Sequence, residues 1–311
     1  MRVFLAGATG VIGRRLVPML LADGHQVTGM TRSQSKADEL RALGAEPVVA
    51  DALNAAGVTE AVRGSRPDAV VHQLTAIPPR IDPRRIERDF AMNDRLRGEG
   101  TRILVGAAQA AGATRIVAQS IAFSYAPGPP GTVHREADPM LLDDALKAFR
   151  RSARALHELE GAVLDAAGIV LRYGYFYGPG SAISRSGSMG HDLSRRRLPI
   201  VGGGQGVWSF IHVDDAARAT VAALAHGQSG AYNVVDDDPA PVSQWLPALA
   251  EALGAPRPLR IPAFLARPLA GAYGVAIMTE AQGASNELAK RELGWTPEHE
   301  SWREGFRTGM S

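Results

Sequence analysis

The stretch Gly7-Ala8-Thr9-Gly10-Val11-Ile12-Gly13 follows the apolar run 3–6 and opens a predicted helix over residues 11–22. Its glycines have the spacing G-x-x-G-x-x-G. The first two allow a tight turn and a close approach of the main chain to a pyrophosphate, and the third lets the helix pack closely on the strand. The free N–H groups at the helix start attract phosphate charge. Because the pattern lies between a strand and a helix, it predicts a dinucleotide-binding fold.

The rest of the chain alternates short apolar runs with amphipathic stretches. We expect strands at residues 3–6, 26–30, 47–50, 69–72, 115–119, 169–172, 208–213 and 232–235. We expect helices at residues 11–22, 36–43, 86–111, 143–167 and 214–225. Apolar strands between helices are typical of a parallel sheet covered on both faces. The pattern predicts an α/β protein with a Rossmann-type, doubly wound sheet and a smaller, mostly helical C-terminal portion.

The texture of the sequence also suggests a division into two portions. Gly, Ser and Pro dominate residues 174–206, which suggests loops around a site. We therefore expect residues 1–173 to form the nucleotide-binding domain, with 207–236 returning to it. Residues 174–311 are expected to form the substrate-binding portion.

Composition excludes several classes of protein. The 311 residues include no cysteine, and 45% of them are hydrophobic. These values exclude a disordered chain, a disulfide scaffold and a cysteine-ligated metal centre. The 34 basic and 32 acidic residues nearly balance, and no basic stripe with interleaved aromatics indicates nucleic-acid binding.

The expected partner is a small-molecule substrate. No signal-peptide core or membrane-length apolar run is present, so a soluble cytoplasmic protein without nucleic-acid or membrane partners is expected. A homodimer is left open. The histidines lack metal-ligand spacing, so we expect no metal.

The residues after the second strand bear on the choice of cofactor. An acidic residue there would bind a ribose 2′-hydroxyl, but the sequence is Met30-Thr31-Arg32-Ser33. Arg32 could bind a 2′-phosphate through two parallel hydrogen bonds, with Arg14 as a second candidate. We therefore expect NADP to be preferred, with NAD left open. Asp51 could accept a hydrogen bond from the adenine amino group or could cap a helix.

An ordered set of segments resembles the short-chain dehydrogenase/reductase superfamily, specifically its extended and atypical members in the NAD-dependent epimerase/dehydratase group. The segments are 7–13, 72–76, Asn93 with Gly100-Thr101, 171–180 and 208–215. The resemblance implies a cofactor site formed by Gly7, Thr9, Gly10, Val11, Ile12, Gly13, Arg32, Asp51, Ala52, Leu74, Thr75, Ala76, Asn93 and Tyr173.

The pattern of this superfamily breaks at its usual catalytic pair. The family chemistry rests on Y-x-x-x-K, in which the ammonium lies beneath the phenol and lowers its pKa. None of the three lysines, Lys36, Lys147 and Lys290, follows a tyrosine by four residues. Alignment on Glu160 and Gly168 places Ser152 at the tyrosine position and Leu156 at the lysine position. A shift of two residues offers Arg150 and Arg154 instead.

Three functions remain open. The favoured hypothesis is an NAD(P)-dependent oxidoreductase that transfers hydride to or from a carbonyl or hydroxyl substrate and uses a non-standard proton donor. Its candidate catalytic residues are Ser120 at the family's Ser/Thr position, Tyr125 after the fifth strand, and Tyr175 at the place of a substrate-contacting Asn. The alternatives are a nucleotide-dependent isomerase, lyase or cyclase, and a non-catalytic NAD(P)-binding sensor. Core packing remains an alternative role for Tyr173, Tyr175 and Tyr177, whose alternation predicts one shared face.

Overall fold

The computed structural model describes residues 1–129, 131–142 and 145–310. Its centre is a seven-stranded sheet of order β12-β7-β5-β4-β1-β2-β3, in which all neighbours run parallel. The strands are β1 Arg2–Ala6, β2 Gln26–Thr31, β3 Glu46–Val49, β4 Ala69–His72, β5 Arg115–Ile121, β7 Ile169–Tyr173 and β12 Gly230–Val234. The predicted doubly wound fold is confirmed.

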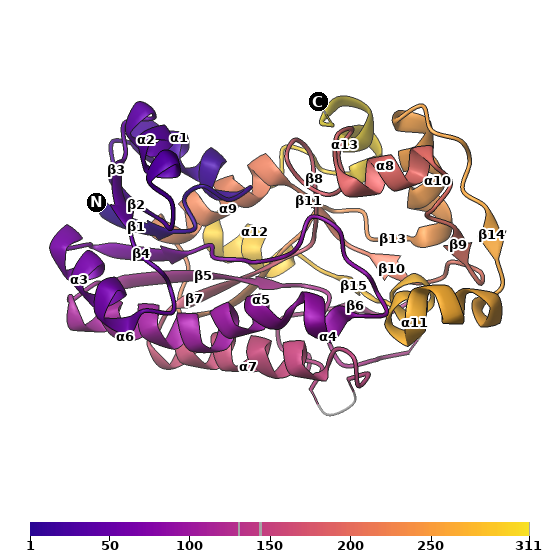
Figure 1. The fold of residues 1–311 in the computed structure, drawn as a ribbon, viewed down its shortest axis with the longest axis horizontal. Helices are drawn as coiled ribbons and strands as arrows, with labels where there is room; N and C mark the ends of the chain where they lie inside the picture. The colour runs from indigo at the N-terminus through magenta and orange to yellow at the C-terminus, as the bar shows by residue number, and fades with distance from the viewer. Residues whose placement is uncertain (130, 143–144, 311) are drawn as a thin grey trace.

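Helices cover both faces of this sheet (Figure 1). One face packs against α1 Gly13–Ala22, α9 Val213–Ala225 and α12 Glu287–Leu293. The other packs against α3 Ala55–Ser65, α6 Thr101–Ala110 and α7 Arg150–Asp165. Along β1, Val3 and Leu5 enter the first core, under α1, α9 and α12, whereas Phe4 and Ala6 pack on the opposite face, under α3, α6 and α7. This alternation explains why the strand is a continuous apolar run.

The remaining elements complete the nucleotide-binding half and build a second core. They are α2 Gln34–Ala42, α4 Ile86–Asp89, α5 Ala91–Arg95, the π-helix η1 Leu96–Gly100, α8 Ser188–Ser194, α10 Val242–Ala252, α11 Ala263–Thr279 and α13 Trp302–Thr308. Short strand pairs join β8 Tyr175–Tyr177 to β11 Phe210–His212, β10 Val207–Trp208 to β13 Ala240–Pro241, β9 Ile200–Val201 to β14 Arg260–Ile261, and β6 Val133–His134 to β15 Gly283–Ala284. The second core contains Trp208, Trp245, Trp302 and Phe306.

Several expected elements differ from those observed. The helix predicted over 86–111 is divided into α4, α5, η1 and α6, and the π-helical turn contains Gly98 and Gly100. Helix α7 begins at Arg150, not at 143. Residues 143 and 144 lie outside the described residues, and Phe149 is buried although it precedes the helix. The spacing of the apolar residues correctly predicted that Phe149 is buried, but the predicted start of the helix was wrong. Helix α3 was not predicted.

The chain crosses between the two portions more than once. Residues 207–212 form β10 and β11, which pair outside the main sheet, whereas α9 and β12 join it. The expected strand 208–213 is interrupted at Ser209, whose hydroxyl accepts a hydrogen bond from the Ala284 N–H (2.9 Å). Helix α12 returns from the C-terminal portion to cover β12, with Leu293 in the first core.

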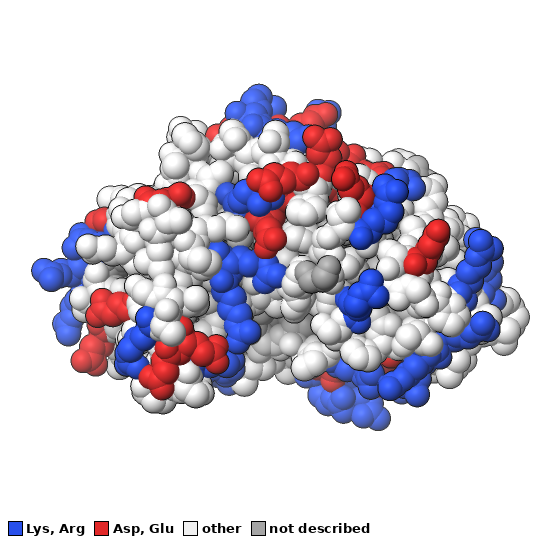
Figure 2. All heavy atoms as spheres, turned by 90° about the horizontal axis from the view of Figure 1, so that it is seen from above, with Lys and Arg blue, Asp and Glu red and all other residues white. Residues whose placement is uncertain are grey.

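The surface and the helices add two observations. On the face shown in Figure 2, the described acidic and basic side chains lie intermixed, without a continuous basic surface. Among the described residues, no helix is long and apolar enough to cross a membrane.

Candidate active site

The glycine-rich loop has the geometry of a phosphate cradle. Gly7 has φ +92°, and a Cβ there would collide with the main chain of Gln73. A Cβ on Gly13 would collide with the carbonyl oxygen of Gly7, so the helix start and the loop touch directly. Within the described chain, the main-chain N–H groups of Thr9, Val11 and Ile12 make no hydrogen bond. Unused donors beside glycines that permit close approach fit a dinucleotide pyrophosphate.

The end of β2 presents an unpaired cation to the expected adenosine side. Arg32 is exposed and follows β2 directly, and it forms no ion pair or hydrogen bond with the described residues. Arg14, in contrast, pairs with Glu39 at 3.2 Å.

Asp51 lies beyond β3 and does not cap a helix. Its Oδ1 accepts a hydrogen bond from the Leu53 N–H (2.9 Å), whereas Asn54 caps α3 through the Gly57 N–H. The helix-cap alternative for Asp51 is therefore wrong. Ala52 beside it is buried.

The loop after β4 is held in place by side chains from three directions. Asn93 Oδ1 accepts from the Ala76 N–H (3.0 Å), and Gln119 donates to the Leu74 carbonyl (3.1 Å). Thr75 between them is exposed. The buried Nδ2 of Asn93 has no partner among the described residues. An unused buried donor beside an exposed loop fits a bound polar group.

Tyr173, expected at the cofactor, lies in the core. Its side chain is 1% exposed, and its hydroxyl bonds to Gln73 Nε2 (3.1 Å) and Thr220 Oγ1 (2.6 Å). Burial raises the pKa of Tyr173 to about 12. The three alternating tyrosines do not share one face: Tyr173 enters the first core, whereas Tyr175 and Tyr177 pack in the second.

Two of the three candidate catalytic residues lie in one buried network. Arg172 pairs with Glu160 through both carboxylate oxygens (3.0 and 2.6 Å), and Ser120 donates to the same carboxylate (2.6 Å). The Tyr125 hydroxyl accepts from Arg172 (2.9 Å) and donates to Asn233 Oδ1 (2.6 Å). Ser120, Arg172 and Asn233 are neighbours because β5, β7 and β12 place them in register.

The charged and hydroxyl groups of this network satisfy one another. Burial alone would lower the pKa of Arg172, but the bonds to Glu160 raise it. Burial also raises the pKa of Tyr125, against the opposing charge of Arg172. A phenol with a raised pKa, already bonded on both sides, is a poor proton donor near neutral pH.

The third candidate, Tyr175, belongs to an aromatic stack. Its ring lies between Phe123 (centroids 4.0 Å apart) and Trp208 (3.8 Å), and Trp208 continues to Trp245 (4.6 Å). The Tyr175 hydroxyl makes no hydrogen bond among the described residues, and burial raises its pKa well above the ordinary value. The stack holds Phe123, at the end of β5, in a fixed orientation.

Helix α7 presents no acid–base pair at the expected position. Ser152 is buried and donates to Asp94 Oδ2 (3.1 Å), and Leu156 is fully buried. Burial raises the pKa of Asp94, and its Oδ1 has no partner in the described chain. One turn further, on η1, the Arg97 guanidinium is buried as well. Asp94 and Arg97 therefore bring charge to this region from α5 and η1, beside Arg151 of α7, which lies 3.8 Å from Asp94.

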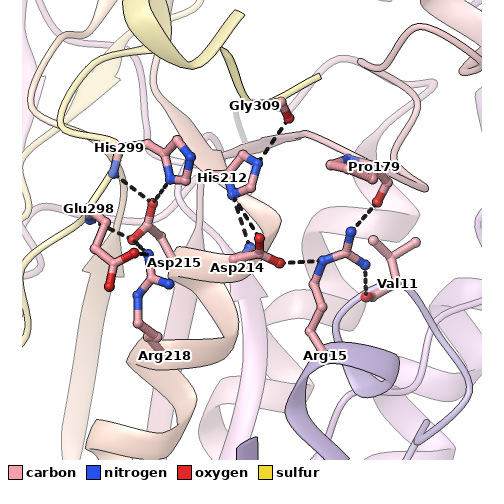
Figure 3. A network of polar contacts seen from close by, with 10 residues as sticks. All are labelled: Val11, Arg15, Pro179, His212, Asp214, Asp215, Arg218, Glu298, His299 and Gly309. Atoms are coloured by element: carbon pink, nitrogen blue, oxygen red, sulfur yellow. Dashed lines mark hydrogen bonds and ion pairs between the residues drawn. The ribbon is translucent and has the colours of Figure 1, made fainter. Parts of the chain in front are cut away.

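A second polar network joins the glycine-rich loop to the C-terminal segment (Figure 3). Arg15 on α1 donates to the carbonyls of Val11 (3.1 Å) and Pro179 (2.6 Å) and pairs with Asp214 (2.6 Å). This contact ties the start of α1 to the loop after β8 and to α9.

The same network contains a cluster with ligand-type side chains: His212, Asp215 and His299. Asp215 accepts from the His299 Nδ1 (2.9 Å) and from Arg218, and His212 Nε2 bonds to the Gly309 carbonyl (3.1 Å). Each of these groups already has a protein partner, so the cluster secures the C-terminal segment on α9. Sequence spacing missed it because His299 lies far from the other two residues along the chain.

Comparison with known proteins defines the class. Residues 3–235 match the model of the NAD dependent epimerase/dehydratase family. The chain is 48% identical to 3-diazoavenalumate denitrifying reductase of a Streptomyces species, over 98% of this chain and 99% of the relative. It is 25% identical to 4-hydroxy-2-methyl-3-oxo-4-farnesyl-3,4-dihydroquinoline-1-oxide ketoreductase of Stigmatella aurantiaca, over 82% of this chain and 74% of the relative.

Solved structures agree on the fold. UDP-glucose 4-epimerase of Thermotoga maritima superposes with a TM-score of 0.78 at 20% identity, over 100% of this chain and 97% of that chain. Human epimerase family protein SDR39U1 with NADPH gives 0.74 at 20% identity, over 100% and 99%. The chain belongs to the NAD-dependent epimerase/dehydratase family and is an NAD(P)-dependent oxidoreductase or epimerase.

Proposed function

We propose that this protein is an NADPH-dependent reductase that replaces the diazo group of an aromatic acid with hydrogen and releases dinitrogen. The proposal draws on the relative named as a diazo-compound denitrifying reductase, which matches along nearly the whole chain at 48% identity. When bound, the reduced cofactor supplies one hydride, so that an arenediazonium group becomes an arene C–H and N₂ while the cofactor is oxidised. The step balances, because the C–N bond breaks, the hydride forms the new C–H bond, and its negative charge cancels the charge of the diazonium cation.

The observation that carries this proposal is the missing proton donor. Reduction of a carbonyl needs a proton at oxygen, and in this superfamily a tyrosine above a lysine delivers it. Here Ser152 and Leu156 occupy those positions, and Ser152 is bonded to Asp94. Reduction of a diazonium ion needs no proton from the protein. A preserved cofactor loop without a tuned phenol therefore suits this reaction better than ketone reduction.

The proposal assigns positioning roles to the residues expected to be catalytic. Ser120 and Tyr125 hold the Arg172–Glu160 pair at the ends of β5 and β7. Tyr175 orients Phe123 through stacking. These roles replace proton transfer by Ser120, Tyr125 or Tyr175.

Cofactor binding is assigned to the segments already described. The N–H groups of residues 7–13 would hold the pyrophosphate, and residues 74–76, held by Asn93, would lie along the cofactor. Arg32 would bind the 2′-phosphate, because this arginine follows β2 and has no partner among the residues that the structure describes.

The test uses 3-amino-4-hydroxycinnamate diazotised with ¹⁵N-labelled nitrite. The hydroxyl beside the diazo group slows spontaneous decomposition. We expect one labelled N₂ per NADPH oxidised, measured by gas mass spectrometry and nicotinamide absorbance, and cinnamate-type product without the diazo group. The matched control is Gly13→Val, whose side chain would collide with the Gly7 carbonyl and abolish cofactor binding. Oxidation of NADPH by a panel of ketones, with no N₂ above the control, would overturn the proposal.

A further inference from the structure

Arg97 is a buried cation without a partner in the described parts of the chain. The residue is only 6% exposed, and no hydrogen bond or ion pair joins its side chain to the described residues. Its NH1 nitrogen is fully enclosed and unsatisfied. A buried charge without a partner costs several kcal/mol, so buried arginines are normally paired. Burial lowers the pKa of Arg97 to about 10, which leaves it charged at neutral pH.

The charged and titratable groups around Arg97 do not neutralise it directly. Glu160 is engaged by Arg172 and Ser120. Asp94 lies beyond ion-pair distance, and its Oδ2 accepts from Ser152. His72, whose pKa Arg97 helps to lower, bonds to Thr101 Oγ1 (2.9 Å) and to the Leu74 N–H.

The remaining neighbour is Tyr273 on α11. Tyr273 lies near enough for its phenol to interact electrostatically with Arg97 and with Tyr175, and its ring stacks on Phe149 (5.2 Å). Its hydroxyl makes no hydrogen bond among the described residues. Helix α11 belongs to the C-terminal portion, so Arg97 lies where the two portions of the molecule meet.

The local backbone also marks this position. Arg97 lies on η1, the π-helix inserted between α5 and α6. π-helical turns inside α-helices occur frequently at functional sites. The turn lies against α7, whose Ser152 and Leu156 stand at the positions of the family's catalytic pair. Ligands of open α/β sheets bind beyond the carboxyl ends of the strands, and His72 and Ser120 lie at or next to the carboxyl ends of β4 and β5.

We propose that Arg97 binds the carboxylate of the substrate and that Tyr273 and Phe123 contact its aromatic portion. This deepens the proposed function by naming the group that anchors the substrate. A carboxylate fits because guanidinium pairs with it through two parallel hydrogen bonds, and its negative charge would compensate the buried cation. An aromatic body fits because Phe123 ends the stack Phe123–Tyr175–Trp208 and is half-buried, and because the phenol of Tyr273 is close enough to interact electrostatically with Arg97.

Binding of cinnamate to the NADP-loaded enzyme tests the proposal without turnover. Cinnamamide is the uncharged probe of nearly equal shape. Isothermal titration should give tighter binding of cinnamate than of cinnamamide to the natural protein. In Arg97→Met the affinity for cinnamate should fall about 30-fold or more, while cinnamamide changes less than about threefold. Arg97→Lys should restore part of the loss, because it keeps the charge without the planar fork.

The matched control is Arg151→Met. Arg151 also lies beside Asp94 (3.8 Å) but is 46% exposed, so its loss should leave cinnamate affinity unchanged. Equal weakening of NADPH and cinnamate in Arg97→Met would overturn the proposal in favour of a cofactor contact. Absence of cinnamate binding to the natural protein, or an unchanged affinity in Arg97→Met, would also overturn it. Since no N₂ release is measured here, failure of this test is distinct from failure of the reductase assay.

Discussion

The network around Arg172 and the region around Arg97 bury the same cation in opposite ways. Arg172 is 5% exposed and Arg97 is 6% exposed. Arg172 meets a bidentate carboxylate, a phenol and the Glu136 carbonyl (3.2 Å), whereas Arg97 meets no partner in the described chain. The charge of Arg172 is therefore compensated within the fold, whereas we propose the substrate carboxylate as the counter-charge of Arg97.

Helix α7 contacts both regions. The Arg172–Glu160 pair links β7 to α7 and keeps the helix in place. On the same helix, Ser152 and Leu156, which the resemblance places at the catalytic pair, are both buried. The neighbouring segment 91–100 carries Asp94 and Arg97 into the same region.

The largest effect is expected from breaking the satisfied network. Arg172→Met leaves Glu160 buried without its counter-charge, so the free energy of unfolding should fall by about 3–5 kcal/mol. Chemical denaturation of both proteins measures this loss. Arg97→Met is the matched comparison: it removes an unpaired buried charge and should leave the free energy of unfolding equal or higher. Comparable losses in the two variants would contradict the distinction between the regions.

The next effect concerns His72, which lies beside Arg97. Burial, together with the charge of Arg97, lowers the pKa of His72 to about 4. Because the unfolded chain binds the proton near pH 6.5, the stability due to neutral His72 is complete above that value and is lost as the pH falls towards 4. The loss should reach about 3 kcal/mol at most.

Denaturation at a series of pH values measures this dependence. His72→Gln stays uncharged at every pH, so its stability should vary less between pH 6.5 and 4 than that of the natural protein. Asp94 and Glu136, whose pKa values burial raises, contribute the opposite slope in both proteins and cancel in the comparison. Parallel curves for the two proteins would show that His72 does not titrate in this range.

A third arginine, Arg32, also lacks a partner in the described chain, but unlike Arg97 it is exposed to solvent. Arg32→Asp should weaken NADP binding by about 2 kcal/mol, or roughly 30-fold, because it removes a charge-assisted contact to the 2′-phosphate. NAD affinity should change little. Arg14→Asp is the control, since Arg14 already pairs with Glu39. Fluorescence titration of both cofactors provides the measurement, and equal weakening of NADP and NAD would remove the assigned role.

The smallest effect tests whether Tyr125 supports the network or donates a proton. Tyr125→Phe removes hydrogen bonds to Arg172 and Asn233 and should lower the free energy of unfolding by about 1–2 kcal/mol. The rate of N₂ release should stay within about threefold of the natural protein, whereas loss of a general acid typically costs about 100-fold or more. Tyr175→Phe is the control for stability, because the Tyr175 hydroxyl has no hydrogen bond in the described chain. A large loss of rate in Tyr125→Phe would return Tyr125 to catalysis.

Sequence reasoning located the cofactor half well because its signals are local. Glycine spacing at 7–13 and the runs 3–6 and 69–72 depend on neighbouring residues, and the observed strands coincide with them to within a residue. The absence of Y-x-x-x-K was equally visible. The resemblance also pointed to Asn93, whose side chain holds the loop at Ala76.

The candidate catalytic residues were harder to interpret because their roles depend on remote partners. Ser120 and Tyr125 form hydrogen bonds with residues 160, 172 and 233, which come close to them only when the sheet forms. Arg97 was missed because it reads as one more charge on an amphipathic helix. One signal could have revealed Arg97: it lies between Asn93 and Thr101, which both belong to the segment that carries the resemblance. This nine-residue interval contains the π-helical turn.

The sequence alone therefore determined a dinucleotide-binding α/β protein that lacks the usual proton-transfer pair. Local backbone needs and apolar periodicity carry that information. Tertiary structure decided which charges are satisfied: it paired Arg172 with Glu160 and left Arg97 enclosed without a counter-charge. The physical reason is that the energy of a charge depends on burial and on partners from distant segments, and neither is encoded in the residues beside it.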